Sequence, residues 1–119
     1  MSVPTSTRRR KYTPEQREAW RIVGARAMRR YRATWMRMVH DAKKKPCIDC
    51  GRDDLPPEVM ELDHVRGEKA FEVSQPHGVR CVDGKTRLQM LEDEIAKCDP
   101  RCPTCHRLRH YEAQLEPVA

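Results

Sequence analysis

A long amphipathic pattern occupies the first third of the chain. Apolar side chains recur every three or four positions, the spacing of one face of a helix, and arginines fill much of the remaining surface. The stretch Thr13-Pro-Glu-Gln16 has the form of a capping box, with a proline at the first helical position. We therefore predict a helix from Pro14 to about Lys44, because Pro46 cannot continue it. The apolar positions are Trp20, Val23, Ala27, Tyr31, Trp35 and Met38.

Two interpretations of this apolar stripe compete. Trp20, Tyr31 and Trp35 can pack on the rest of the chain or on a second copy, as apolar helix faces usually do. Alternatively, aromatic rings among arginines can stack on exposed bases or sugars. Since the chain has one Phe, its two Trp residues are a large share of the aromatic surface, and the pattern favours packing.

Shorter signals follow this helix. Residues 59–64 alternate between two faces and predict a short strand. The helical spacing of Leu88, Leu91 and Ile95 predicts a helix over residues 85–97. We also expect a brief strand or turn at residues 98–101, a closing helix at residues 103–114, and an irregular segment at residues 66–78 whose Phe71 and Val73 cover a small core.

The composition indicates a small domain with a thin core. A length of 119 residues leaves room for one small domain and an extension. Because only 38% of the residues are apolar and 35% are charged, the core must be thin. Domains this small often need a bound metal to offset chain entropy. No apolar run suits a membrane span or a signal peptide, so we expect a protein of the reducing cytoplasm. The six cysteines are then better interpreted as metal ligands than as disulfides, a choice that an export signal would reverse.

The net charge of +6 hides a strong segregation. Residues 8–45 hold 14 Lys or Arg against 3 acidic residues, whereas residues 46–119 hold 10 against 15. Such a basic segment gains affinity for DNA through counterion release. The alternatives are a solvated basic helix, a disordered tail or a helix on a membrane surface, and we expect DNA and no membrane. The predicted DNA contacts are Arg17, Arg21, Arg29, Arg30, Arg32 and Arg37.

Two Cys-x-x-Cys pairs have the spacing of zinc knuckles. Thiolates three positions apart can bind one Zn²⁺ from a tight turn, and two such turns complete a tetrahedral structural site. The stretch Cys102-Pro-Thr-Cys-His106 also matches the attachment pattern for c-type haem, which the second pair and the lack of an export signal disfavour. We predict structural zinc at Cys47, Cys50, Cys102 and Cys105, with Cys81 and Cys98 outside its shell.

A histidine follows the last cysteine directly, and Asp63-His64 ends the predicted strand. Over roughly residues 46–112, this combination resembles the HNH endonucleases, in the small phage-type subgroup with a four-cysteine zinc. The strings Leu62-Asp-His-Val-Arg-Gly-Glu-Lys69 and Glu94-Ile-Ala-Lys-Cys-Asp99 resemble that subgroup as well. The resemblance implies an α+β fold, with a zinc-stabilised ββα-metal (HNH/His-Me finger) domain after a long basic N-terminal helix. The chain contains no Asn, so the asparagine of the family name is missing, and Lys97 or Cys98 lies near its expected place.

The same resemblance implies a metal-dependent endonuclease that hydrolyses DNA phosphodiester bonds. In it His64 is the general base that activates water, a task that suits an imidazole. Asp63 and His106 hold one divalent ion, Mg²⁺ or Mn²⁺, although imidazole also suits Zn²⁺ and Ni²⁺. His110 lies one helical turn after His106 and is either a further ligand or an exposed residue that contacts phosphate. His40 and His77 are expected at the surface.

The resemblance also suggests partners. They are DNA and, for a phage-encoded chain in a host cytoplasm, genome-packaging proteins, with a mobile element as the other role. The alternative function is a zinc-containing DNA-binding protein without catalysis. The predicted organisation is a disordered basic arm at residues 1–12, a basic amphipathic helix for DNA binding or packing at residues 13–45, the nuclease domain at residues 46–115 and a tail at residues 116–119.

Overall fold

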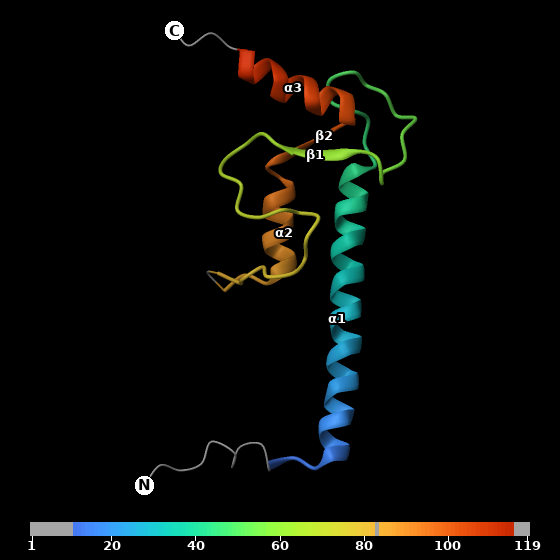
Figure 1. The fold of residues 1–119 in the computed structure, drawn as a ribbon, viewed down its shortest axis with the longest axis vertical. Coiled ribbons are helices and arrows are strands. Elements are labelled where there is room, and N and C mark those ends of the chain that lie inside the picture. Colours follow the sequence, from blue (N-terminus) through green and yellow to red (C-terminus); the bar gives the residue numbers. More distant parts are fainter. Residues whose placement is uncertain (1–10, 83, 116–119) are drawn as a thin grey trace. The chain divides into compact units, whose positions relative to one another are not determined.

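The structure is a computed structural model that describes residues 11–82 and 84–115. The predicted tail, and all but the last two residues of the predicted basic arm, lie outside the described residues. The chain divides into two compact units, Met1–Ala33 and Thr34–Ala119. The boundary expected after residue 45 stays a prediction. Along the chain come α1 (Pro14–Lys43), β1 (Glu61–His64), α2 (Arg87–Ile95), β2 (Cys98–Arg101) and α3 (Pro103–Leu115) (Figure 1).

The first helix begins and ends close to the predicted residues. The capping box is present, because the N–H of Thr13 donates to Gln16 Oε1 at 2.9 Å and the N–H of Gln16 donates to Thr13 Oγ1 at 3.1 Å. These bonds satisfy backbone donors that a helix N-terminus leaves unpaired. α1 ends at Lys43, one residue before the predicted end.

The apolar stripe of α1 has two different environments. In the first unit Trp20 is 61% exposed, and its ring lies 4.6 Å from that of Tyr12. In the second unit Trp35 and Val39 are buried. Packing is therefore confirmed for Trp35, whereas Trp20 keeps most of its surface in solvent. None of the described helices is both long and apolar enough to cross a membrane.

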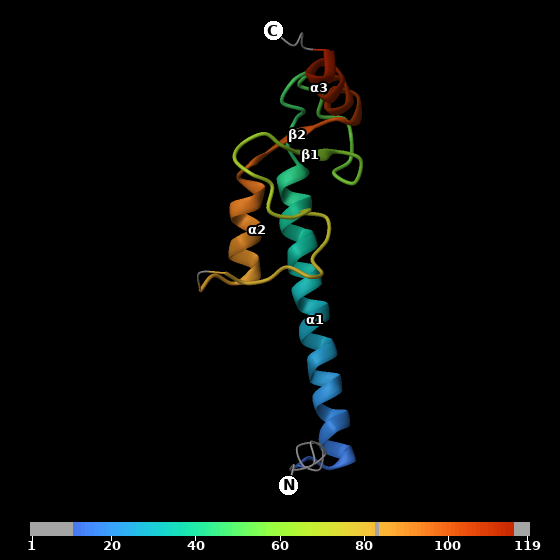
Figure 2. The ribbon, with the colours of Figure 1, turned by 60° about the vertical axis from the view of Figure 1, so that its left-hand side comes forward.

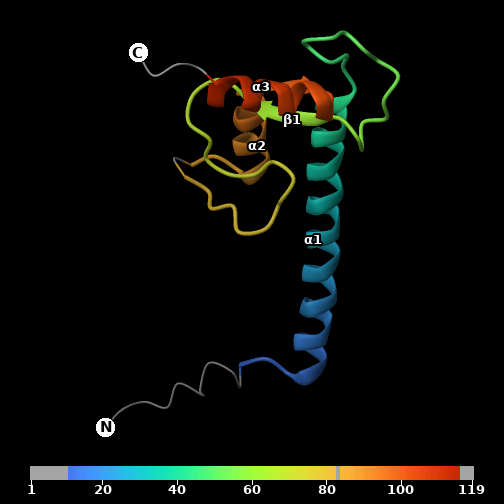
Figure 3. The ribbon, with the colours of Figure 1, turned by 45° about the horizontal axis from the view of Figure 1, so that its top comes forward.

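The second unit is built on a two-stranded antiparallel sheet, β1 paired with β2. The register places Glu61 opposite Arg101 and His64 opposite Cys98. Two helices flank this sheet on opposite sides, α3 on one and α2 on the other (Figures 1 and 2). Figure 3 shows α3 lying over β1. Because neighbouring residues of a strand face opposite sides, β1 can present one set of side chains to α3 and another to α2.

The first and last residues of the helices and strands after α1 lie within two residues of the predicted ones. The strand begins at Glu61 instead of residue 59, because the preceding residues form a turn in which the N–H of Val59 donates to Pro56 O. α2 starts two residues later than predicted, after a capping box between Thr86 and Gln89. Residues 98–101 form a strand, which decides between the two predicted forms.

Trp35 anchors the small core of the second unit. Its side chain is fully buried, and its Nε1–H donates to Val73 O at 2.6 Å. The ring lies 5.7 Å from that of Phe71, so the predicted cover of the core by Phe71 and Val73 is confirmed. The other buried apolar side chains away from the cysteines include Val39, Val79 and Leu91. A core of this size leaves little stability to spare.

Replacing Trp35 with Phe should destabilise the second unit. The ring is kept but its N–H is lost, so the buried carbonyl of Val73 loses a donor, a change that costs about 1–3 kcal/mol. Trp20→Phe is the matched control, and its effect should stay within about 0.5 kcal/mol because Trp20 is exposed. Urea unfolding followed by circular dichroism measures both. Equal midpoints for the two variants would contradict the assignment of Trp35 as the core anchor.

Candidate metal centres

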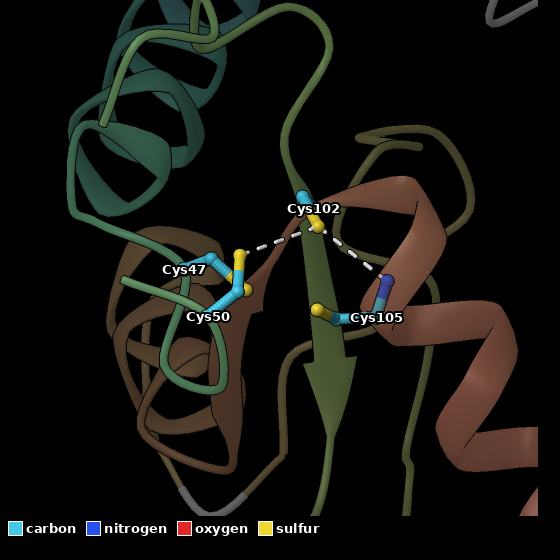
Figure 4. A group of neighbouring side chains, drawn as sticks. All are labelled: Cys47, Cys50, Cys102 and Cys105. Carbon is cyan, nitrogen blue, oxygen red and sulfur yellow. Dashed lines mark hydrogen bonds between the residues drawn. The ribbon is translucent and has the colours of Figure 1, made fainter. Parts of the chain in front are cut away.

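Four cysteine side chains meet in the second unit, and we call them the four-cysteine centre. Their sulfur atoms all lie within 4.8 Å of one another, and Cys50 Sγ is 3.9 Å from Cys102 Sγ. Sulfur atoms bound to one tetrahedral Zn²⁺ at about 2.3 Å are about 3.8 Å apart. The donor set and its spacing thus fit a metal such as zinc. The structure brings together the four cysteines predicted from the two pairs, Cys47, Cys50, Cys102 and Cys105 (Figure 4).

Local backbone structure shapes this centre. Gly51 has a φ of +72°, a left-handed conformation that glycine adopts without strain, and its N–H closes the turn onto Cys47 O at 2.9 Å. The N–H of Ile48 donates to Pro100 O at 3.0 Å and ties this turn to β2. At the start of α3, the N–H of Cys105 donates to Cys102 Sγ at 3.4 Å. Hydrogen bonds donated by backbone N–H groups therefore hold both Cys-x-x-Cys turns.

The thiols of this centre differ in acidity. Burial raises the pKa of Cys47, but backbone hydrogen bonds at Cys50, Cys102 and Asp49 outweigh it and bring the pKa down to about 6. The pKa of Cys105 is raised to about 12, first by its hydrogen bond to the Cys102 side chain and then by burial. Cysteines bind a metal as thiolates, so the affinity of this centre for a metal should rise with pH.

The remaining two cysteines lie outside this centre, as predicted. Cys81 is exposed, whereas Cys98 is buried and its Sγ donates to Glu94 O at 3.4 Å. Burial raises the pKa of Cys98 to about 11, which keeps it a thiol. Neither belongs to a candidate ligand group among the described residues.

A second group of possible ligands joins β1 to α3, and we call it the Asp63 centre. Asp63 Oδ1 lies 3.3 Å from His106 Nε2 and 3.8 Å from His110 Nε2, and the two Nε2 atoms are 3.1 Å apart. Donors around one ion with bonds of about 2.1 Å lie about 3.0–3.4 Å apart. The structure therefore brings together the three candidate ligands that the sequence analysis named, Asp63, His106 and His110.

Two arginines orient the Asp63 carboxylate, which is 4% exposed. Arg101 and Arg109 both donate to its Oδ2, at 2.9 and 2.7 Å. This leaves Oδ1 directed at the two imidazoles. Arg101 also donates to Asp49, which lies between Cys47 and Cys50, and this hydrogen bond lowers the pKa of the Asp49 carboxyl. Arg101 thus links the two centres directly.

The predicted general base has a different environment. His64 Nε2 is buried and has no hydrogen-bond partner among the described residues. Glu94 Oε1 lies 3.4 Å away, close enough for an ion pair but not aligned as a hydrogen bond. Glu94 is itself buried and accepts from the N–H of Ala70 at 2.9 Å and from Lys97 Nζ at 3.1 Å. Among the described contacts, His64 therefore meets α2, whereas its neighbour Asp63 meets α3. Lys97, one candidate for the place of the missing asparagine, donates a hydrogen bond to Glu94.

The residues predicted at the surface are at the surface. His77 is exposed, and the partly exposed His40 has its Nε2 3.1 Å from Glu58 Oε1. All six arginines predicted to contact DNA are exposed along α1. Two of them have partners within the helix: Arg21 pairs with Glu18, and Arg32 Nε donates to Met28 O.

Sequence reasoning missed four residues of this region. Glu61 lies beside His106, Glu94 beside His64, and the two arginines beside Asp63. Strand alternation was a usable signal for Glu61, because residues two apart on a strand share a face. Helical spacing could likewise have placed Arg109 near His106, three residues earlier on α3. For Glu94 and Arg101 the chain carries no local signal, since their partners come from distant segments.

Comparison with known proteins adds no identification: no family model, no curated protein and no solved structure matches the chain. The geometry of the two centres is therefore the basis for any statement of function. Membership of the HNH family stays a prediction from the sequence.

Replacing one cysteine of the four-cysteine centre should unfold the second unit. Cys50→Ser and Cys105→Ser each remove a ligand, and in so small a domain the binding free energy of a structural metal is also folding free energy. Both variants should lose the single equivalent of zinc expected for the wild type and melt at a lower temperature. Elemental analysis and thermal unfolding measure these effects. Cys81→Ser, at an exposed cysteine outside the centre, should change neither, and a Cys50→Ser protein with full zinc content would overturn the assignment.

Proposed function

We propose that this chain is a metal-dependent endonuclease that hydrolyses DNA phosphodiester bonds, with the divalent ion held at the Asp63 centre. The observation that carries the proposal is the convergence of a carboxylate oxygen and two imidazole nitrogens, 3.1–3.8 Å apart, beside the exposed ring of His110. A protein that only binds DNA needs the four-cysteine centre and the basic helix. It has no use for a second group of ligands that is open to solvent.

The residues of the Asp63 centre suit this chemistry. Phosphodiester hydrolysis needs a nucleophilic water, neutralisation of the phosphate charge and stabilisation of the departing 3′ oxygen, and a bound divalent ion supplies the last two. Asp63 offers a hard oxygen ligand for Mg²⁺ or Mn²⁺, in an orientation that Arg101 and Arg109 hold. Arg109 has a side chain that is 43% exposed, so it can also donate to a phosphate bound at this centre.

His64 is the general base in this proposal, and that role rests on the HNH resemblance alone. Its contact with the buried Glu94 favours the second candidate function, a zinc-containing DNA-binding protein without catalysis. In that protein His64 and Glu94 would join β1 to α2 as part of the core. The two functions therefore differ in what His64 does.

DNA is proposed as the substrate because of the charge of the N-terminal region. Residues 8–45 hold 14 Lys or Arg against 3 acidic residues. The six arginines of α1 that we predict to contact DNA are exposed and can bind phosphates without reading bases, which supports binding that is strong at low salt and independent of sequence.

Incubation of the purified protein with supercoiled plasmid tests the proposal. Cleavage should occur with Mg²⁺ or Mn²⁺ and stop with EDTA. Asp63→Ala and His106→Ala should lose most of the activity because they weaken binding of the ion, and a higher Mn²⁺ concentration should partly restore it. Lys69→Gln is the control, since the exposed Lys69 pairs with Glu72 and has no described contact with either centre. A wild-type protein that binds plasmid but never cuts it with any divalent ion would leave the DNA-binding module as its function.

The same assay separates the two roles of His64. If His64 is the general base, His64→Ala and His64→Gln should each lower the cleavage rate about 10²-fold or more, and added metal should not restore it. The Gln variant keeps a polar group beside Glu94 and should retain zinc, fold and DNA binding. A Gln variant with the wild-type cleavage rate would assign His64 to the core.

The arginines of α1 should control the salt dependence of DNA binding. Replacing Arg17, Arg29 and Arg30 together with Gln should reduce the slope of log affinity against log salt by about 0.9 for each phosphate that the variant no longer neutralises. Fluorescence anisotropy with a labelled duplex at several salt concentrations measures this slope. An unchanged slope in the triple variant would place the phosphate-binding residues elsewhere in the chain.

A further inference from the structure

We propose that Glu61 is a positioning residue that fixes the tautomer of His106, so that His106 Nε2 presents its lone pair to a metal ion at the Asp63 centre. This inference rests on the metal site of the proposed function and does not require that the ion cleave DNA. It concerns a residue that lies outside the candidate ligand group of this centre.

The two ring nitrogens of His106 face two different carboxylates. Nδ1 lies 3.2 Å from Glu61 Oε1, and Nε2 lies 3.3 Å from Asp63 Oδ1. A neutral imidazole has one N–H, so only one carboxylate can receive it. Asp63 already accepts two hydrogen bonds from arginines. Among the described residues, the His106 imidazole is the ion-pair partner of Glu61. We therefore assign the N–H of His106 to Nδ1, where it donates to Glu61.

The strand makes this contact a fixed one. Glu61 and Asp63 are two residues apart on β1 and share the face that α3 covers. The His106 side chain is 22% exposed and lies between the two carboxylates. Glu61 approaches the Nδ1 side of the ring, away from the Nε2 atom that faces the Asp63 centre. It therefore acts through His106 and is not itself a ligand, in the way that carboxylates orient metal-bound histidines.

The contact between the two imidazoles agrees with this assignment. His106 Nε2 and His110 Nε2 are 3.1 Å apart, a distance that requires one of them to donate to the other. With the proton of His106 on Nδ1, His106 accepts and His110 donates. A metal ion takes the place of that shared proton. His110, whose side chain is 67% exposed, can then carry its own proton on Nδ1, next to solvent.

A second carboxylate–histidine pair provides the control. His40 Nε2 lies 3.1 Å from Glu58 Oε1, but this pair belongs to no candidate ligand group in the described chain. Removing Glu58 therefore removes a contact of the same kind without touching the Asp63 centre.

The test uses the full chain with zinc in the four-cysteine centre and compares wild type with Glu61→Ala, Glu61→Gln and Glu58→Ala. Nitrogen-15 NMR of the His106 ring should report the Nδ1–H tautomer in the wild type and in Glu61→Gln, because the amide oxygen still accepts. Glu61→Ala should shift His106 toward the Nε2–H tautomer. Mn²⁺ binding, followed by the electron paramagnetic resonance signal of the free ion, should weaken about 10- to 100-fold in Glu61→Ala. It should weaken less in Glu61→Gln and not at all in Glu58→Ala.

Two results would overturn the inference: an unchanged His106 tautomer in Glu61→Ala, or wild-type Mn²⁺ affinity in that variant. If Glu61→Ala fails to fold, Glu61→Met serves instead, since it keeps the length of the side chain and removes the acceptor. A wild-type chain with the expected tautomer and Mn²⁺ affinity that cuts no plasmid would refute the nuclease and support the role of Glu61.

Discussion

The convergence of four cysteines from two distant segments is the constraint on which the second unit depends. A sheet of two short strands and a core of a few apolar side chains bury too little surface to hold a loop and a helix in place. The four sulfurs meet where the turn at residues 47–50 lies beside the end of β2 and the first turn of α3, and a metal bound there would hold these segments together. Arg101 extends this link, because it binds Asp49 of the turn and Asp63 of β1. Order at the four-cysteine centre is thus coupled to the orientation of the Asp63 carboxylate.

The pleat of β1 separates two sets of polar side chains. Glu61 and Asp63 face α3 and meet its imidazoles, while His64 lies against Glu94 of α2. A carboxylate as buried as that of Glu94 is costly unless it is paired, and Ala70, Lys97 and His64 surround it. The α3 side of the strand therefore combines the properties of a metal site, and the α2 side those of a polar core contact. This difference explains why the role of His64 is the point at which the two candidate functions diverge.

The helix α1 has two different environments along its length. Its last ten residues belong to the second unit, where Trp35 and Val39 are buried. Its earlier turns expose arginines together with Trp20 and Val23. The apolar stripe, which is continuous in the sequence, is thus buried in its later part and exposed in its earlier part. The arginine-rich turns retain the charge that phosphate binding requires, independently of how the core is packed.

Local patterns in the sequence were sufficient for the elements and for the candidate ligand groups. The capping box at Thr13 and the spacing of the two Cys-x-x-Cys pairs each depend on residues a few positions apart, so the sequence alone determined where α1 begins and which four cysteines would meet. Asp63 and His106 were likewise predictable as one group. The different exposure of Trp35 and Trp20 was not, because both belong to the same apolar stripe and differ only in what lies opposite them.

Only the tertiary structure decided which neighbours these ligands have. The pairing of Arg101 with Asp49 and Asp63, of Glu61 with His106 and of Glu94 with His64 joins segments 30 to 52 residues apart in the chain. Such contacts depend on the register of β1 and β2 and on which face of the sheet each helix covers, and no short-range pattern records either one. The physical reason is that ligand type and spacing are local properties of a chain, whereas the hydrogen bonds that orient a ligand come from whichever distant side chain the fold brings within about 3 Å.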